Sequence, residues 1–224
     1  MTTDPSPEQA DYARTALEAA EALLRILSDV LDISRIESGH LTLVEEPFDL
    51  SEVIRPVASS FAHEAASKGL SFVWSIAPQT PTRLSGDAGR LRQILYNLTA
   101  NAIKYTPTGQ VRLEIQTREQ ETDAERVAVH FTVADSGIGI PSEHLNRIFE
   151  AFTQVDPSVT RPYGGSGLGL AIVKGLVDRM PGIFTSSRTT STGLAARISR
   201  AASPPLALKT VSPRRVRRFF SVST

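Results

Sequence analysis

A glycine-rich stretch in the C-terminal third constrains this chain more than any other feature. Gly164, Gly165, Gly167 and Gly169 run directly into an apolar helical pattern that begins at Leu170. Glycine allows positive φ angles and lets a ligand approach main-chain N–H groups closely. A helix that begins there directs its free N–H groups and positive dipole end at whatever lies in front of it. The stretch is therefore typical of a phosphate-binding loop, although glycine-rich turns also occur for structural reasons alone.

Two common phosphate-binding loops do not fit this stretch. Its spacing differs from G-x-x-x-x-G-K-[ST], which excludes a P-loop. No strand leads directly into it, as a dinucleotide-binding fold requires. The preceding segment, residues 153–162, is polar and contains proline, which predicts a mobile loop.

Composition excludes several classes of protein. The chain has 224 residues, of which 41% are hydrophobic and 21% charged, and no cysteine, so disulfides and cysteine metal sites are excluded. No apolar run reaches the ~18 residues of a membrane span, and residues 1–10 are acidic rather than typical of a signal peptide. We expect a soluble, cytoplasmic protein.

The charge is distributed unevenly along the chain. Residues 181–224 hold eight of the 24 basic residues and none of the 24 acidic ones, so residues 1–180 carry a net charge of −8. An acidic body with a basic tail indicates two kinds of sequence joined together. The run from Arg214 to Arg218 is also compatible with a nucleic-acid or nuclear-targeting patch, but we expect no nucleic-acid partner.

The first forty residues predict one long helix. Ser6 is a typical N-cap, with Pro7 at the first helical position and Gln9 at the third, and Gly39 is a typical end. Apolar residues then alternate at spacings of four and three, as in a coiled coil: Ala13, Leu17, Ala20, Leu24, Leu27 and Leu31. We expect a homodimer or heterodimer through residues 8–38. The alternative is a helix that packs on the chain's own domain.

The remaining pattern predicts alternating helices and strands. The expected elements are a strand from Leu41, a helix over 50–68 kinked or delayed by Pro56, a strand over 70–76, a helix over 88–105, two strands around 111–115 and 127–133 joined by a charged loop at 119–125, and a short helix from Pro141. This order lacks strict βαβ alternation. It predicts an α+β fold, a two-layer sandwich of helices on one face of a mixed sheet.

Two asparagines mark the polar face of the helix expected over 88–105. Asn97, Asn101 and Lys104 share one face, although asparagine is unfavourable inside a helix. An amide oxygen can ligand Mg²⁺ together with phosphate oxygens and water, and lysine can neutralise phosphate charge. The alternative is a solvated helix face.

Asp135 ends a strand and is followed by Gly137 and Gly139. A carboxylate there can accept a hydrogen bond from an exocyclic amine while the glycines leave room for a flat ring. A plain Asp-Ser-Gly turn is the alternative, and it is common.

Four ordered motifs then resemble one family. Residues 91–106, 135–140, 148–152 and 164–170 resemble the N, first glycine, F and second glycine boxes of sensor histidine kinases. The resemblance is to the kinase core of the hybrid two-component type, covers about residues 10–180, and corresponds to that core truncated at both ends. It implies the Bergerat ATP-binding fold, which gyrase B, heat-shock chaperone and mismatch-repair ATPases share, preceded here by one long dimerisation-type helix.

The resemblance also implies roles for individual residues, with ATP and Mg²⁺ as ligands. It implies catalytic roles for Asn97, Asn101 and Lys104, with Asn101 as the Mg²⁺ ligand and Asn97 near the phosphates, where related hydrolases carry a Glu that acts as general base. It implies that residues 153–164 form the ATP lid and that Phe149 and Phe152 pack to anchor it. The remaining nucleotide contacts that it implies are Tyr105, Asp135, Gly137, Ile138, Gly139, Gly165, Ser166, Gly167, Leu168 and Gly169.

Two departures from the family pattern affect the expected function. None of the four histidines (His40, His63, His130 and His144) continues the family's acceptor pattern, so we expect phosphoryl transfer only to another polypeptide. Beyond residue 180 the two closing strands of the family have no counterpart in the pattern. We therefore expect a dimerisation-hairpin remnant over 1–40, an ATP-binding domain over 41–180 with uncertain last strands, and a disordered, non-homologous tail over 181–224.

These expectations combine into one function with two alternatives. The favoured function is an ATP-binding sensor-kinase core in a two-component phosphorelay, with a histidine-bearing kinase hairpin or a response-regulator domain as partner. The alternatives are a non-catalytic dimerising module that modulates full-length kinases, and an ATP hydrolase of the same fold.

Overall fold

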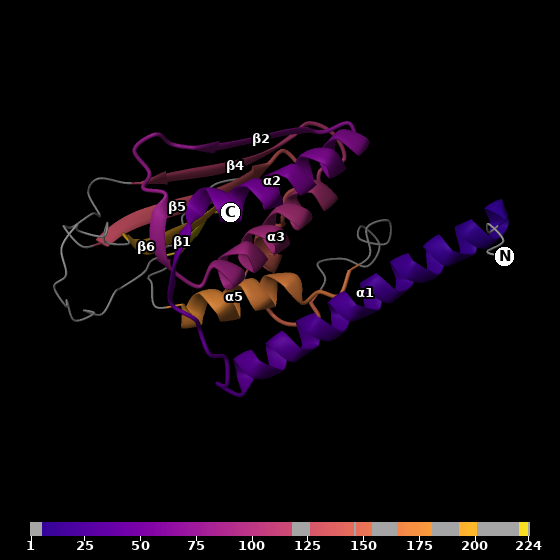
Figure 1. Ribbon diagram of the computed structural model, residues 1–224, viewed down its shortest axis with the longest axis horizontal. Coiled ribbons are helices and arrows are strands. Elements are labelled where there is room, and N and C mark those ends of the chain that lie inside the picture. The colour runs from indigo at the N-terminus through magenta and orange to yellow at the C-terminus, as the bar shows by residue number, and fades with distance from the viewer. Residues whose placement is uncertain are drawn as a thin grey trace, which may run out of the picture. The chain divides into compact units, whose positions relative to one another are not determined.

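The structure is a computed structural model that describes residues 6–117, 126–145, 147–153, 165–180, 193–200 and 220–223. It divides into two compact units, Met1–Leu41 and Thr42–Thr224. Most elements of the two units are labelled in Figure 1.

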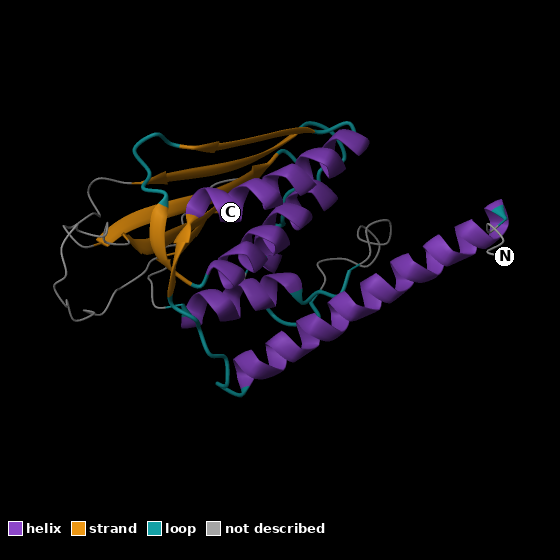
Figure 2. Ribbon diagram, viewed as in Figure 1, coloured by secondary structure: helices purple, strands orange, loops and turns teal. Residues whose placement is uncertain are grey.

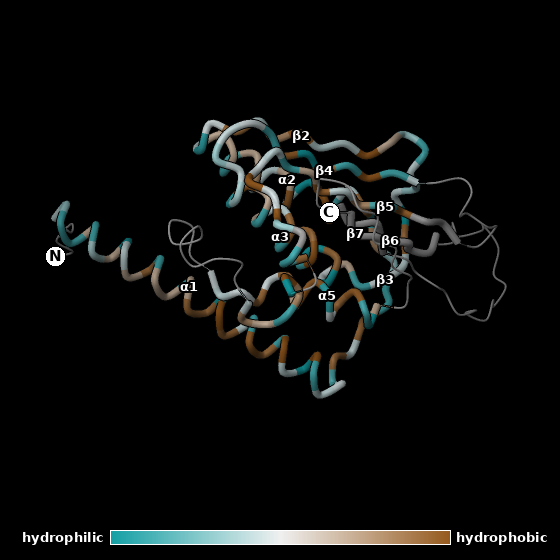
Figure 3. Tube along the Cα trace, turned by 180° about the vertical axis from the view of Figure 1, so that it is seen from behind, coloured by the Kyte–Doolittle hydropathy of each residue, from teal (hydrophilic) through white to brown (hydrophobic). Residues whose placement is uncertain are grey.

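The first unit is one long helix, α1 (Pro7–Glu37). Its start confirms the predicted capping box, because the Gln9 N–H donates to Ser6 Oγ (3.2 Å) and the Ser6 N–H donates to Gln9 Oε1 (2.9 Å). Gly39, with φ +74°, follows its last turn as predicted. Hydrophobic segments recur along α1 in Figure 3, and the leucines of its predicted seam are exposed: Leu17, Leu24, Leu27 and Leu31.

The second unit contains the sheet and the remaining helices. In chain order its elements are β1 (Glu46–Asp49), α2 (Leu50–Ser67), β2 (Ser71–Ile76), β3 (Arg83–Gly86), α3 (Ala88–Lys104), β4 (Gln110–Thr117), β5 (Arg126–Asp135), a 3-10 turn η2 (Ser142–His144), α5 (Gly169–Arg179), β6 (Gly193–Arg200) and β7 (Phe220–Ser223). Figure 2 shows α2, α3 and α5 on one face of the sheet, which confirms the predicted two-layer α+β architecture.

The sheet is mixed. Its strand order is β1-β3-β6-β5-β4-β2, and β7 pairs with β6. The pair β2–β4 is parallel, with Phe72 opposite Val111, and the other pairs are antiparallel. In the β4–β5 pair, Leu113 lies opposite Val133 and both side chains are buried. This register ends β5 at Asp135, beside the start of β4.

The core lies between the sheet and the helices. The predicted apolar face of α3 is buried along its whole length. This burial confirms the helix face that was predicted from the spacing of its apolar residues. The largest fully buried side chains of the described residues are Phe61, Phe131, Leu50, Ile54, Leu84, Leu91, Ile94, Leu95, Ile103, Leu113 and Ile115.

Several predicted boundaries differ from the structure near the first strands. Residues 41–45 form no strand, and the Val44 N–H donates instead to Asp87 Oδ2 (3.1 Å). The edge strand β1 follows and contains Pro47, which edge strands tolerate. The helix start at Leu50 is not delayed by Pro56, because Asp49 caps it by accepting the Ser51 N–H (2.7 Å).

The C-terminal residues also differ from the expectation. No strand was predicted beyond residue 180, yet β6 lies between β3 and β5, and β7 pairs with β6. Backbone pairing on both sides holds β6, and its apolar alternation is weak in the sequence because Ala195 and Ala196 are adjacent. Residues 181–192, 201–219 and 224 lie outside the described residues, as does the predicted loop at 119–125. The domain boundaries stay a prediction.

Within the described ranges, no helix combines the length and the hydropathy needed to cross a membrane.

Candidate functional site

The site is built from α3, which a capping aspartate fixes at its start. Asp87 Oδ1 accepts the Arg90 N–H (2.9 Å), while its other oxygen holds the Val44 N–H. One face of α3 is buried against the sheet. Asn97, Asn101 and Lys104 lie on another face and are half-buried. The helix therefore presents two amides and an ammonium group along one line, as predicted.

Asn97 meets the start of α5. Its Nδ2 donates to the Gly169 carbonyl oxygen (3.4 Å). A Cβ on Gly169 would lie 3.7 Å from Asn97 Cγ, at ordinary van der Waals distance. The fold thus brings together two residues that are 72 positions apart and that the sequence analysis assigned to one site.

Lys104 lies beside the glycine-rich stretch. Its Nζ is 4.6 Å from the centre of the Tyr105 ring, within cation–π range. A Cβ on Gly165 would lie only 2.6 Å from Lys104 Nζ. The absence of a side chain at Gly165 therefore lets the ammonium group approach the backbone closely. The structure places Lys104, Tyr105 and Gly165 together.

The loop after β5 is held against the end of α3. Asp135 Oδ1 accepts the Gly137 N–H (2.9 Å), and the Ile138 N–H donates to the Tyr105 carbonyl (3.2 Å). Gly139 follows with φ +69°, a conformation that favours glycine. The side chains of Asp135 and of the asparagines therefore belong to segments joined by hydrogen bonds. This part of the predicted site is contiguous.

The second glycine-rich segment is fixed mainly through its backbone. The Phe152 N–H donates to the Gly167 carbonyl (3.1 Å), and both residues have positive φ. Ser166 Oγ accepts the Leu168 N–H (3.3 Å), and the Leu168 side chain is fully buried. Phe149 is half-buried, but the Phe152 side chain is 69% exposed. The predicted packing role is therefore wrong for Phe152, whose contact here is made by its main chain.

Part of the predicted site lies outside the described residues. Residues 154–164, which include Gly164 and nearly all of the predicted lid, are not described. Thr153 is described, and its N–H donates to the Glu150 carbonyl (3.3 Å).

Two hydroxyl residues that were not predicted as site residues join these segments. Ser136 Oγ accepts the Gln110 N–H (2.9 Å), which ties the Asp135 loop to the start of β4. A Cβ on Gly109 would lie 2.3 Å from that hydroxyl. Thr106 Oγ1 donates to the Ala102 carbonyl (2.7 Å) at the end of α3. Both residues directly follow predicted site residues, and short hydroxyl side chains there commonly bond the local backbone.

Comparison with known proteins identifies this arrangement. The family model described as "Histidine kinase-, DNA gyrase B-, and HSP90-like ATPase" matches residues 86–203, which include α3, the Asp135 loop, α5 and β6. Among curated proteins, the kinase BarA of Escherichia coli K12 is 38% identical over 182 residues, which are 81% of this chain and 20% of that protein. GacS of Pseudomonas syringae pv. syringae is 41% identical over 177 residues, which are 79% of this chain and 19% of that protein.

A solved structure agrees with these relatives. Full-length ShkA in complex with AMPPNP superposes with a TM-score of 0.68 at 32% identity, covering 91% of this chain and 42% of that one. The chain spans about a fifth of the length of the two curated relatives. It is homologous to hybrid histidine kinases and contains an ATP-binding catalytic module. The chain belongs to the family of histidine kinase-, DNA gyrase B- and HSP90-like ATPases.

Proposed function

We propose that this chain binds Mg·ATP and transfers the γ-phosphoryl group to a histidine in a two-component phosphorelay. The observation that carries the proposal is the composition of α3, which contains no Asp or Glu. The helix therefore offers no carboxylate to activate water at the position of Asn97. A histidine acceptor requires no such base, since a neutral imidazole nitrogen is already a nucleophile.

The proposed site has an adenine end and a phosphate end. Asp135 accepts a hydrogen bond from the adenine amine, with Gly137, Ile138 and Gly139 beside the ring. At the other end, the phosphate chain is bound by α3 and by the second glycine-rich segment, with these proposed contacts: Asn97, Asn101, Lys104, Tyr105, Gly165, Ser166, Gly167, Leu168 and Gly169. The AMPPNP complex of the similar ShkA structure is consistent with this occupancy.

The bond changes follow from this placement. The acceptor imidazole nitrogen attacks the γ-phosphorus, and the bond from that phosphorus to the β–γ bridging oxygen breaks, so that ADP leaves. Lys104 lies where its positive charge can stabilise the charge on the phosphate oxygens in the transition state. Since none of the four histidines continues the family's acceptor pattern, we place the acceptor histidine outside these 224 residues.

The donor set fits Mg²⁺. The described residues contain no group of three or more His, Cys, Asp or Glu side chains that could hold a metal by themselves. Mg²⁺ is commonly bound by one or two protein oxygens together with substrate phosphates and water, and the Asn101 amide oxygen would be such a ligand. When bound, the ion would neutralise phosphate charge.

A second function is favoured by a separate observation. The exposed seam leucines of α1 fit a helix that pairs with another helix. We therefore propose a homodimer or heterodimer through residues 8–38, with a kinase hairpin or a response-regulator domain as the other partner. A module that dimerises and modulates full-length kinases without transferring phosphate is the alternative to catalysis.

A transfer assay separates the candidate functions. The full chain is incubated with [γ-³²P]ATP, Mg²⁺ and a separate hairpin that carries an acceptor histidine, and an Asn101→Ala variant is assayed in parallel. Acid-labile label on the hairpin that is lost in Asn101→Ala would support the kinase. Steady release of inorganic phosphate without transfer would indicate a hydrolase. ATP binding with neither outcome would indicate the modulating module.

A further inference from the structure

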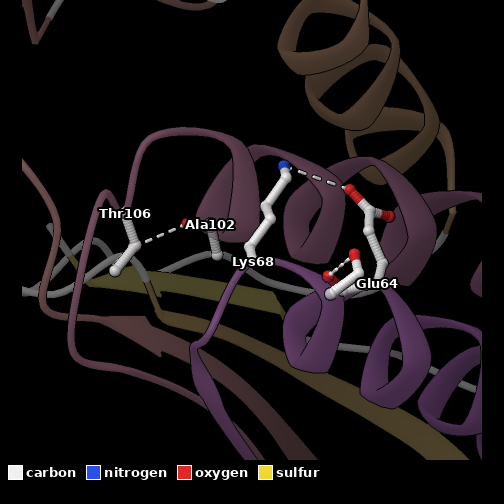
Figure 4. Close-up of polar contacts among 5 residues, drawn as sticks. Glu64, Lys68, Ala102 and Thr106 are labelled. Carbon is white, nitrogen blue, oxygen red and sulfur yellow. Dashed lines mark hydrogen bonds and ion pairs between the residues drawn. The ribbon is translucent and has the colours of Figure 1, made fainter.

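The Thr106 side chain is buried directly after α3, where a helix leaves carbonyl groups without partners. Thr106 is 2% exposed, and its Oγ1 donates to the Ala102 carbonyl at 2.7 Å, a contact drawn in Figure 4. The last four carbonyls of a helix lack intrahelical donors. The hydroxyl therefore supplies a donor to the last turn of α3 and fixes the peptide that leaves it.

That peptide carries the contact to the Asp135 loop. The Tyr105 carbonyl, one residue before Thr106, accepts the Ile138 N–H at 3.2 Å. A Cβ on Gly137 would lie 2.3 Å from this carbonyl oxygen and 3.0 Å from Thr106 Oγ1. Both groups at the end of α3 thus lie against the Gly137 backbone.

The contacts form one connected path across the site. It runs from the Ala102 carbonyl through Thr106 and Tyr105 to the loop, where the Gly137 N–H donates to Asp135 Oδ1 at 2.9 Å. Ala102 is adjacent to Asn101 on α3. The path therefore joins the helix that carries the phosphate-side residues to the carboxylate at the adenine end.

We propose that Thr106 is a positioning residue for adenine recognition: its hydroxyl sets the place of the Asp135 carboxylate relative to Asn101 and Lys104. The inference rests on the proposed function, since it assigns the adenine end to Asp135. Replacing the hydroxyl by a methyl group leaves the Ala102 carbonyl unpaired in a buried place, which is unfavourable. The last turn then relaxes, and the Tyr105 carbonyl and the loop that it holds move with it.

Two matched pairs of chains test this role. The first pair is the unchanged chain and Thr106→Val, which replaces the hydroxyl by a methyl group of similar size. The second pair is Thr106→Ser and Thr106→Ala, which differ in the hydroxyl and both lack the γ-methyl group. The affinity of each full-length chain is measured by calorimetry for Mg·ATP and for the Mg²⁺ complex of purine riboside 5′-triphosphate, which lacks the exocyclic amine. The thermal midpoint of each variant is recorded in parallel.

The ratio of the affinity for ATP to the affinity for purine riboside 5′-triphosphate measures recognition of the adenine amine. We expect the unchanged chain and Thr106→Ser to prefer ATP, and Thr106→Val and Thr106→Ala to lose about tenfold of that preference, the equivalent of one buried hydrogen bond. A purely structural role would weaken both nucleotides equally and leave the ratio unchanged, which would overturn the proposal. If Thr106→Val fails to fold, an equal ratio in the Ser and Ala variants would overturn it.

The assay also separates the two levels of the proposal. An unchanged chain that binds neither nucleotide would overturn the proposed function and this inference with it. An unchanged chain that binds both nucleotides with equal affinity would overturn the adenine role of Asp135 while leaving phosphate-side binding intact.

Discussion

The helices α1 and α3 have similar apolar stripes but differ in what covers them. On α3, Leu95 is fully buried, as are Leu91 and Ile94. On α1, Leu24 is 66% exposed, and the seam around it is exposed as well. An apolar stripe at helical spacing shows that a helix needs a partner surface, but it does not show which one. For α3 that surface is the chain's own core, and for α1 we propose a second helix.

The largest effect is expected from shortening a core leucine of α3. Leu95→Ala should lower the free energy of unfolding by about 2–5 kcal/mol, because it leaves a cavity in a fully buried site. The same change at Leu24 should alter this transition by less than about 0.5 kcal/mol. Urea denaturation measures both at a low protein concentration. Equal losses at the two sites would remove the distinction between the helices.

A polar seam on α1 should affect association rather than folding. Each buried leucine contributes about 1.5–3 kcal/mol, so Leu24→Gln together with Leu31→Gln should weaken dimerisation at least about 100-fold. Analytical ultracentrifugation gives the dissociation constant, and Glu18→Gln, on an exposed part of the same helix, serves as control. A chain that is monomeric before the change would contradict the proposed dimer.

The ends of the two helices sharpen the comparison. A Cβ on Gly137 would lie 2.3 Å from the Tyr105 carbonyl at the end of α3, whereas a Cβ on Gly39, after α1, would meet no atom within 4 Å. Gly137→Ala should therefore cost about 1–3 kcal/mol through overpacking and weaken ATP binding. Gly39→Ala should cost about 1–2 kcal/mol for its positive φ alone and leave ATP binding unchanged.

Those two variants are measured by thermal unfolding and by ATP calorimetry. A Gly137→Ala chain that binds ATP like the unchanged protein would show that the contact between Gly137 and Tyr105 does not hold the adenine end in place.

The smallest effect concerns an acidic residue of α1. Burial raises the pKa of Asp29, the neighbouring Asp32 carboxylate raises it further, and Arg25 lowers it. A raised folded-state pKa means that the folded chain holds this proton to higher pH than the unfolded chain. The stabilisation is therefore present below the ordinary carboxyl pKa and is lost as the pH rises through the raised value. Asp29→Asn should add about 0.5 kcal/mol at neutral pH and remove this pH dependence.

Thermal unfolding of both chains between about pH 3 and pH 7, the range in which carboxyl groups titrate, measures this pH dependence of stability. A variant whose stability follows the same pH curve as the unchanged chain would contradict the assignment to Asp29.

The sequence predicted the long, periodic elements of the fold and missed the short ones. The apolar spacing of α3 and the alternation of β4 and β5 depend on burial, which leaves a pattern in the side chains. The strands β1 and β3 are four residues each, and β1 contains Pro47, so neither shows enough alternation to be recognised. In β6, Leu194, Ala196 and Ile198 alternate with Ala195, Arg197 and Ser199, but the adjacent alanines make that alternation too weak to be recognised.

The candidate site shows the same division. The family resemblance assigned Asn97, Lys104, Gly165 and Gly169 to one nucleotide site. The structure brings Asn97 to Gly169 and Lys104 to Gly165. Thr106 escaped prediction because it acts on a main-chain carbonyl, and that acceptor is present at every position of a sequence. The exposure of Phe152 also escaped, since an aromatic residue in a motif suggests packing while its main chain makes the contact.

Calorimetry of Mg·ATP binding to the full chain tests most directly whether α3 and the Asp135 loop form a nucleotide site. We expect one site per chain, and we expect Asn101→Ala to weaken binding at least about tenfold with an unchanged thermal midpoint, which corresponds to about 1.4 kcal/mol. Gln116→Ala, at an exposed amide on β4, should bind like the unchanged protein. A folded chain that binds no Mg·ATP, or an Asn101→Ala variant that binds it as tightly as the unchanged chain, would contradict this account.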